Sequence, residues 1–200
     1  MGQNPGALPA RPPAFAGGRG WFWRAAGRSY LRLGGWRIEG ALPEVPKCVT
    51  IVAPHTSNWD FLLGVALLFA LDLRVSWLGK HALFRRPFDG FLRWLGGIPV
   101  DRRVRSGVVG ACAEAFAEAP SLMLALSPEG TRKGPGGWRT GFYWIAVAAG
   151  VPVFPVAFDF DRHRILFLPL FTPTGDLDQD LPKIQALFEG VRGLKDRRRN

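Results

Sequence analysis

From residue 47 onward, short runs of β-branched and apolar residues alternate with longer runs of helical periodicity. The short runs predict strands at 49–53, 74–78, 122–126, 151–158 and 165–168, with a short extended segment at 98–100. The longer runs predict helices at 61–71, 87–95, 106–119, 142–149 and 181–194. Because strands and helices alternate, we expect an α/β domain in which helices flank both faces of a central, largely parallel sheet.

The first forty residues differ in composition from the rest of the chain. Residues 1–20 are rich in proline, glycine and arginine, which predicts a disordered tail. Residues 21–40 form an amphipathic segment that is both basic and aromatic, with a short helix expected over 21–35. The folded domain is expected to cover 45–196.

The net charge of +10 is concentrated at the two ends of the chain. Residues 1–40 hold six arginines and one glutamate, whereas residues 41–189 are nearly neutral, which argues against a nucleic-acid partner. Tryptophan and tyrosine interleave with arginine over 21–40, a mixture that favours the headgroup level of an anionic membrane. We therefore expect a peripheral protein on the cytoplasmic side of a membrane, although a solvated basic terminus fits the same pattern.

The longest apolar run, Phe61 to Leu71, has 11 residues, whereas a helix that spans a bilayer needs about 20. We expect a core helix there. The alternative is a helix that lines a channel for the acyl chain. Cys48 and Cys112 lie in apolar stretches without the spacing of a zinc site, so no metal is expected. Prolines near the start do not fit a secretory signal peptide.

A histidine and an aspartate, His55 and Asp60, follow the first predicted strand. Side chains share a helix face at spacings of three or four, so contact between this pair needs a turn, which Pro54 and the next residues can supply. An aspartate that orients an imidazole leaves its other nitrogen free to act as a general base on a hydroxyl. The same residues also fit a helix cap formed by Ser57 and Asp60, with His55 an ordinary loop residue.

A second polar segment, 127–133, follows another predicted strand. Gly130 permits a tight turn, Arg132 offers a planar fork for phosphate, and Thr131 adds a donor. A surface turn with an ion pair between Glu129 and Arg132 fits the segment as well.

Three polar residues stand at or just beyond the ends of predicted strands, namely His55, Lys80 and Glu129. The carboxyl ends of parallel strands lie at one edge of a sheet, and ligands of α/β proteins bind beyond that edge. We therefore expect these residues to surround one site.

Together with two further motifs, these segments resemble the glycerophospholipid acyltransferase family, of which the 1-acylglycerol-3-phosphate acyltransferases are the best-known members. The family's first block, His-x4-Asp, matches His55 and Asp60. The other blocks follow in the family's order: Gly-x-Ile-x-Val-Asp-Arg at 96–102, Pro-Glu-Gly-Thr-Arg at 128–132 and Val-Pro-x-x-Pro-Val at 151–156.

The resemblance implies an O-acyltransferase domain over 45–196 that serves phospholipid biosynthesis. It implies transfer of a fatty acyl group from acyl-CoA or acyl carrier protein to the hydroxyl of a lysophosphatidic acid-like acceptor, with no cofactor. His55 is then the general base, and Asp60 orients it. The expected substrate-binding residues are Glu129, Gly130, Thr131 and Arg132, with Lys80 and Arg102 as weaker candidates.

Three positions depart from the family pattern. Pro54 stands where an asparagine is frequent, Ser127 where a phenylalanine is common, and Lys133 where a serine is common. These changes leave the histidine and aspartate intact, but they leave the identity of the acceptor open. Two alternatives therefore stay open: the same chemistry on another lipid alcohol or an amino-acid-containing lysolipid, and a non-catalytic lipid-binding protein on the same scaffold.

Overall fold

The computed structural model of the chain describes residues 8–54, 57–100, 105–129 and 137–194. The strands are β1 (Arg37–Glu39), β2 (Lys47–Ala53), β3 (Ser76–Lys80), β4 (Gly97–Val100), β5 (Leu122–Leu126), β6 (Val153–Asp159) and β7 (Arg164–Phe167). The helices are α1 (Gly20–Leu33), α2 (Trp59–Ala70), α3 (Asp89–Trp94), α4 (Arg105–Glu118), α5 (Gly141–Ala149) and α6 (Leu177–Ala186). Two 3-10 turns, η1 (Pro13–Phe15) and η2 (His81–Leu83), complete the list.

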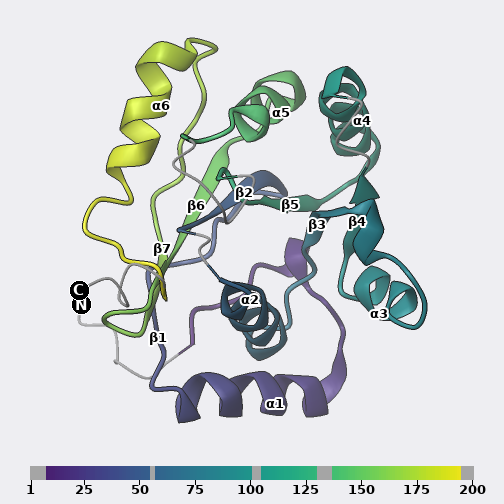
Figure 1. Cartoon of the computed structure of the whole chain (residues 1–200), viewed down its shortest axis with the longest axis vertical. Coiled ribbons are helices and arrows are strands. Elements are labelled where there is room, and N and C mark those ends of the chain that lie inside the picture. The colour runs from purple at the N-terminus through teal and green to yellow at the C-terminus, as the bar shows by residue number, and fades with distance from the viewer. Residues whose placement is uncertain (1–7, 55–56, 101–104, 130–136, 195–200) are drawn as a thin grey trace.

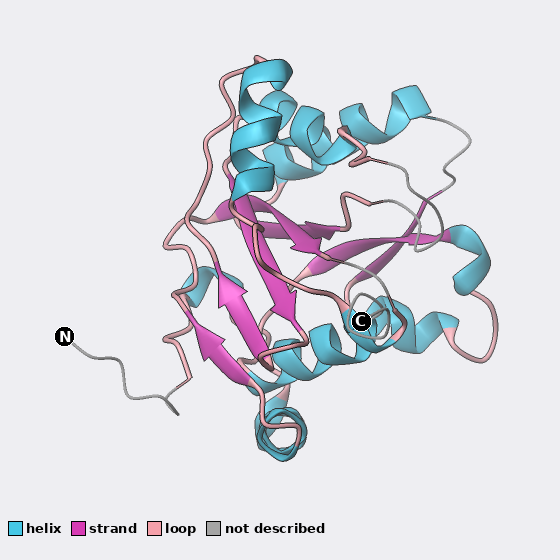
Figure 2. Ribbon diagram, turned by 60° about the vertical axis from the view of Figure 1, so that its left-hand side comes forward, coloured by secondary structure: helices cyan, strands magenta, loops and turns pink. Residues whose placement is uncertain are grey.

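The seven strands of the described residues form one sheet in the order β1-β7-β6-β2-β5-β3-β4. The neighbours from β6 to β4 run parallel, whereas β7 is antiparallel to β6 and carries β1 in parallel at the edge. Helices α4, α5 and α6 lie on one side of the sheet, and α2 lies on the other with α1 outside it (Figures 1 and 2). The predicted α/β class and the largely parallel sheet are confirmed.

Alternating side chains of the central strands fill a separate core on each face of the sheet. In β2, Cys48 packs into the core under α2, whereas Val49 and Ile51 pack under α4 and α5. Successive side chains of a strand point to opposite faces, so a strand covered on both faces is apolar at nearly every position, and Thr50, the polar residue of this run, is buried as well. This explains why the run at 49–53 showed no polar alternation.

The segment before α1 packs along the domain, which differs from the disorder expected for residues 1–20. Phe15 is only 1% exposed and belongs to the core under α2. The backbone N–H of Gly17 donates to the carbonyl of Asp72 at 2.7 Å, and the carboxylate of Asp72 forms an ion pair with Arg11. A single aromatic anchor in a proline-rich stretch has no periodicity, so this contact could not be predicted from the sequence. Residues 1–7 lie outside the described part of the chain.

Helix α1, predicted over 21–35, crosses α2 at close range through a glycine. A Cβ atom added at Gly27 would lie 2.5 Å from the nitrogen of Ala70 and 2.6 Å from the carbonyl oxygen of Ala66. Both atoms belong to the backbone of α2 and cannot move aside as a flexible side chain would. Gly27 therefore sets the distance between the two helices.

The Gly27→Ala variant is expected to unfold with a free energy about 1–3 kcal/mol lower than that of the wild-type chain, because overpacking a core contact costs this much. The clash outweighs the helix propensity of alanine, which alone would favour the variant by about 1 kcal/mol. Urea unfolding followed by circular dichroism measures the difference. The matched control is Gly110→Ala in α4, where an added Cβ meets no atom within 4 Å and stability should hold or rise. Equal stabilities for both variants would contradict the close crossing.

Two other elements differ from their predictions. The last helix was predicted over 181–194, but α6 ends at Ala186 and the chain continues in turns. Asp180 in α6 is fully buried, and its carboxylate accepts hydrogen bonds from the Tyr143 hydroxyl at 2.9 Å and the Thr174 N–H at 2.7 Å.

Strand β1 was missed because its three residues include two charged ones, a pattern too short to recognise.

Candidate active site

The carboxyl ends of four parallel strands bring the family motifs to one edge of the sheet. The registers that align these strands are Ile51 with Leu126, Trp77 with Ala125 and Lys80 with Val100. The first motif block begins two residues after β2 and the third begins two residues after β5, the second block contains β4, and Lys80 is the last residue of β3. The expectation that these strand ends share one edge is therefore confirmed.

Several predicted site residues lie outside the described part of the chain, namely His55, Arg102, Gly130, Thr131 and Arg132. For Lys80 the backbone alone is described, as the end of β3. The roles of these six residues remain predictions. Asp60 and Glu129 are the two predicted site residues whose side chains can be placed.

Asp60 lies in the first turn of α2 and is only 2% exposed. Its Oδ2 accepts a hydrogen bond from the backbone N–H of Ser57 at 2.7 Å, and the Ser57 hydroxyl accepts one from the N–H of Trp59 at 2.9 Å. The two residues cap the helix reciprocally, as the alternative interpretation of the motif predicted. A carboxylate accepts several hydrogen bonds at once, so the cap fixes Asp60 without excluding a contact with an imidazole.

A backbone hydrogen bond joins the two ends of the segment between β5 and α5. The backbone N–H of Arg139 donates to the carbonyl of Pro128 at 2.6 Å, which joins the two ends of the third motif and the glycine-rich stretch behind it. Trp138 packs with its ring against Phe142 and Phe188, at centroid distances of 6.0 and 5.3 Å. Trp138 thereby anchors the returning chain on the core under α5. A lone tryptophan after a run of glycines was the available signal for this role, and sequence reasoning missed it.

Ser127 occupies the position between β5 and the third motif. Its hydroxyl oxygen is buried and has no hydrogen-bond partner among the described residues. Buried hydroxyls in proteins are nearly always hydrogen-bonded. The Ser127 hydroxyl is therefore a candidate to hydrogen-bond a substrate at this motif. Glu129, two residues further, is partly buried in the turn that begins the motif.

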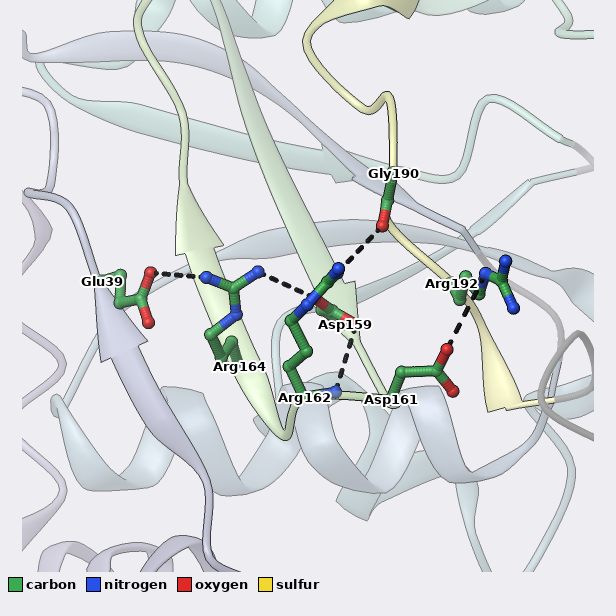
Figure 3. A network of polar contacts seen from close by, with 7 residues as sticks. All are labelled: Glu39, Asp159, Asp161, Arg162, Arg164, Gly190 and Arg192. Atoms are coloured by element: carbon green, nitrogen blue, oxygen red, sulfur yellow. Dashed lines mark hydrogen bonds and ion pairs between the residues drawn. The ribbon is translucent and has the colours of Figure 1, made fainter.

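A charged network at the end of β6 was not predicted (Figure 3). Asp159 is fully buried and pairs with Arg164 at 3.0 Å and Arg162 at 3.2 Å, while Arg164 also reaches Glu39 at 3.2 Å. Burial raises the pKa of Asp159, but the hydrogen bonds from the two arginines outweigh it and lower the pKa below its usual value. Since β6 is the neighbour of β2, this network fixes the strand ends beside the first motif.

Other residues of suitable chemistry in the described part serve the structure. His163 lies 2.7 Å from the carbonyl oxygen of Gly34 through its Nδ1 and stacks on Trp36 at 5.2 Å. Burial raises the pKa of the Cys48 thiol to about 12, so it stays protonated and is a poor nucleophile. Among the described residues, no group of three or more histidine, cysteine, aspartate or glutamate side chains could hold a metal ion.

Comparison with known families decides what these motifs belong to. The Acyltransferase family matches residues 39–159, more than half of the chain, and this range contains all four motif blocks. The chain belongs to the acyltransferase family. The family resemblance of the sequence is thereby confirmed.

Two bacterial relatives of this acyltransferase-family chain carry the same name. The chain is 30% identical over 155 residues to the 1-acyl-sn-glycerol-3-phosphate acyltransferase of Haemophilus influenzae, a match that covers 72% of the chain and 61% of the relative. It is 32% identical over 120 residues to the enzyme of the same name from Escherichia coli, covering 57% of the chain and 48% of the relative. The chain thus spans about half to three fifths of the length of these relatives.

A solved structure supports the fold. The 1-acyl-sn-glycerophosphate acyltransferase of Thermotoga maritima superposes with a TM-score of 0.62 over 90% of this chain and 79% of that one. The sequence identity is 20%, so the match supports the architecture of this acyltransferase-family chain and leaves its acceptor to be argued from the site.

Proposed function

We propose that the chain transfers a fatty acyl group from a thioester donor, either acyl-CoA or acyl carrier protein, to the hydroxyl of a lysophosphatidic acid-like acceptor. One observation carries the proposal: a buried Asp60 is fixed at the start of α2, directly after the segment that holds His55. In the sequence, the pair follows the carboxyl end of β2, and the third family motif follows the carboxyl end of the neighbouring strand β5. The names of the two bacterial relatives support the same reaction.

In the proposed mechanism, His55 removes the proton of the acceptor hydroxyl as the oxygen attacks the thioester carbonyl. The tetrahedral intermediate then collapses, the carbon–sulfur bond breaks, and the imidazolium returns its proton to the departing thiolate. Asp60 orients the ring and stabilises the positive charge that it gains. Backbone N–H groups at the strand ends stabilise the oxyanion. The chemistry uses neither a metal nor a covalent acyl-enzyme.

The acceptor phosphate is assigned to the third motif. Arg132, with Thr131 and the backbone at Gly130, binds it through charge-assisted hydrogen bonds, and Glu129 orders the turn. Lys80 ends β3, Arg102 stands two residues after the neighbouring strand β4, and both would add positive charge for the acceptor phosphate.

A second class of acceptor is favoured by Ser127. The resembling family commonly has phenylalanine at this position, and here a smaller side chain carries a buried hydroxyl with no partner in the described residues. A lipid alcohol with an additional polar group would supply that partner. The same base would act on it, so the two acceptor classes differ in binding and share the chemistry.

Release of free thiol from palmitoyl-CoA tests the proposal. The purified chain should release thiol with lysophosphatidic acid present and form phosphatidic acid, seen by mass spectrometry. Acyl carrier protein is tested as donor in parallel. Faster release with lysophosphatidylserine would favour the second acceptor class. Binding of lysolipid without any thiol release would instead support the non-catalytic alternative and overturn the proposal.

We also propose that the chain works as a peripheral protein on the cytoplasmic side of a membrane, since both acceptor classes are lipids. No helix in the described part of the chain is long and apolar enough to cross a bilayer. The basic and aromatic segment 21–40 supports membrane contact.

A further inference from the structure

The chain after α6 passes from one face of the sheet to the other. We call residues 187–194 the C-terminal segment. Near its start, Phe188 packs against the core under α4 and α5, whereas at its end Leu194 packs against the core under α2. The two cores lie on opposite faces of the sheet, so the segment crosses between them. Figure 1 shows it leaving α6 toward the turn between β6 and β7.

A backbone hydrogen bond places this crossing at the carboxyl end of β2. The carbonyl of Pro152 accepts the N–H of Val49 in β2 at 3.0 Å, and backbone groups along a strand alternate between its two neighbours. Phe160, just after β6, is an even number of residues further along, so its N–H also points to the side of β2. This N–H donates to the carbonyl of Arg192 at 3.0 Å. Arg192 therefore lies where β2 would continue beyond Ala53, the residue after which the chain turns to the first motif.

Side chains of the turn after β6 fix the same crossing (Figure 3). The guanidinium of Arg162 donates to the carbonyl of Gly190 at 3.1 Å and to the buried carboxylate of Asp159 at 3.2 Å. Arg192 and Asp161 approach to 3.8 Å, an exposed pair that adds little stability. The C-terminal segment is thereby held against the strand end that neighbours β2.

At its other end, the C-terminal segment contacts the base of the third motif. The ring of Phe188 lies 5.3 Å from that of Trp138, measured between centroids. The N–H of the next residue, Arg139, donates to the carbonyl of Pro128 at 2.6 Å. Pro128 is buried and is the first residue of the motif. One path of contacts thus leads from Phe188 to the start of the motif that is assigned to the acceptor phosphate.

Helix α6 is anchored without the ring of Phe188. Ile184 is fully buried in the core under α5, and the carboxylate of Asp180 accepts the Tyr143 hydroxyl at 2.9 Å and the Thr174 N–H at 2.7 Å. These contacts hold the helix before the C-terminal segment begins. The contact of Phe188 with Trp138 adds a fixed position for the chain that returns from the third motif.

We propose that the C-terminal segment positions the acceptor-binding motif, with Phe188 as the positioning residue. Phe188 contacts no reacting atom and acts through Trp138 and the hydrogen bond between Arg139 and Pro128. The inference rests on the proposed function, which assigns the acceptor phosphate to the third motif. A misplacement of about 1 Å can cost up to about 10²-fold in an enzyme. Loss of this support should therefore weaken binding of the acceptor and leave the donor unaffected.

Steady-state kinetics and calorimetry on the full chain test the proposal. Phe188→Ala should raise KM for a short-chain, monomeric lysophosphatidic acid about tenfold, with kcat and KM for palmitoyl-CoA within about twofold of the wild-type values. Isothermal titration calorimetry without donor should show the same rise in Kd for this lysolipid. Phe188→Tyr keeps the ring and should keep both constants. If Phe188→Ala does not fold, Phe188→Leu is measured instead and should raise both constants about threefold.

The matched control is Phe171→Ala. Phe171 is also a partly buried ring against the core under α5, but its backbone pairs with Val153 at the amino end of β6, the opposite edge of the sheet. Phe171→Ala should lower the thermal unfolding midpoint, as Phe188→Ala does, because each removes packing from the same core. KM and Kd for lysophosphatidic acid should stay at the wild-type values in the control.

Two results would overturn the positioning role: wild-type KM and Kd for the lysolipid in Phe188→Ala or Phe188→Leu, or an equal rise of both constants in Phe171→Ala. The calorimetric comparison needs no turnover. A wild-type chain that binds lysophosphatidic acid without releasing thiol would sink the proposed function, and the Kd values would then decide the positioning role by themselves. A chain that neither binds nor acylates lysophosphatidic acid would sink both.

Discussion

The His55→Ala variant is expected to transfer acyl groups about 10²- to 10⁴-fold more slowly than the wild-type chain, the usual contribution of a positioned general base. This loss corresponds to about 3–5 kcal/mol of transition-state stabilisation. A hydroxyl is a poor nucleophile while it keeps its proton, so removal of the base slows the attack itself. Initial rates of thiol release at saturating donor and acceptor measure the effect on kcat.

The control for His55→Ala is another histidine with a described structural role. His163 contacts the Gly34 carbonyl and stacks on Trp36, so His163→Ala should lower the thermal unfolding midpoint and leave kcat within about twofold of the wild-type value. Equal losses of kcat in both variants would point to general destabilisation. A fully active His55→Ala enzyme would remove the proposed mechanism.

The central strands could be predicted because strands buried on both faces appear in the sequence as short runs of apolar residues. The run at 122–126 is the same five residues as β5, and 49–53 falls within β2, since strands buried on both faces are continuously apolar. Strand β1 could not be predicted in this way. It pairs only with β7 at the edge, and its place depends on a partner far along the chain.

In the site, too, features that depend on local sequence could be predicted, whereas features that depend on long-range contacts could not. The His-x4-Asp block has a fixed spacing, so the sequence predicts the pair, whose histidine lies outside the described residues, and, as the alternative interpretation, the cap that holds Asp60, which the hydrogen bond from Ser57 confirms. The Asp159 network needed contacts between β1, β6, β7 and the C-terminal segment, and none of these is local. The contact of Trp23 in α1 with Trp94 in α3, at a centroid distance of 5.1 Å, is similar, because the two rings meet only after α1 has packed on α2. Local patterns thus identify chemistry, while long-range packing decides how the chemistry is supported and presented.

The Asp60→Asn variant is expected to lower kcat at least about 10²-fold while the chain keeps its stability. The amide oxygen of asparagine can still accept the Ser57 N–H that Asp60 Oδ2 accepts at 2.7 Å, so the helix cap survives. The negative charge that stabilises an imidazolium is lost. The amide can also present a donor, which would favour the wrong tautomer of His55; the comparable change in a serine protease costs about 10⁴-fold.

The Ser57→Ala variant separates the cap from the chemistry. It removes the hydroxyl that accepts the Trp59 N–H at 2.9 Å, which should cost about 0.5–2 kcal/mol of stability, the usual value for a lost cap. Its kcat should stay close to that of the wild-type chain, since the carboxylate of Asp60 remains. Thermal unfolding and thiol-release rates are measured on both variants. Asp60→Asn should lower the rate and leave the stability unchanged, whereas Ser57→Ala should lower the stability and leave the rate unchanged. If Asp60→Asn kept its full rate, Asp60 would serve only to begin α2, and His55 would act without the carboxylate.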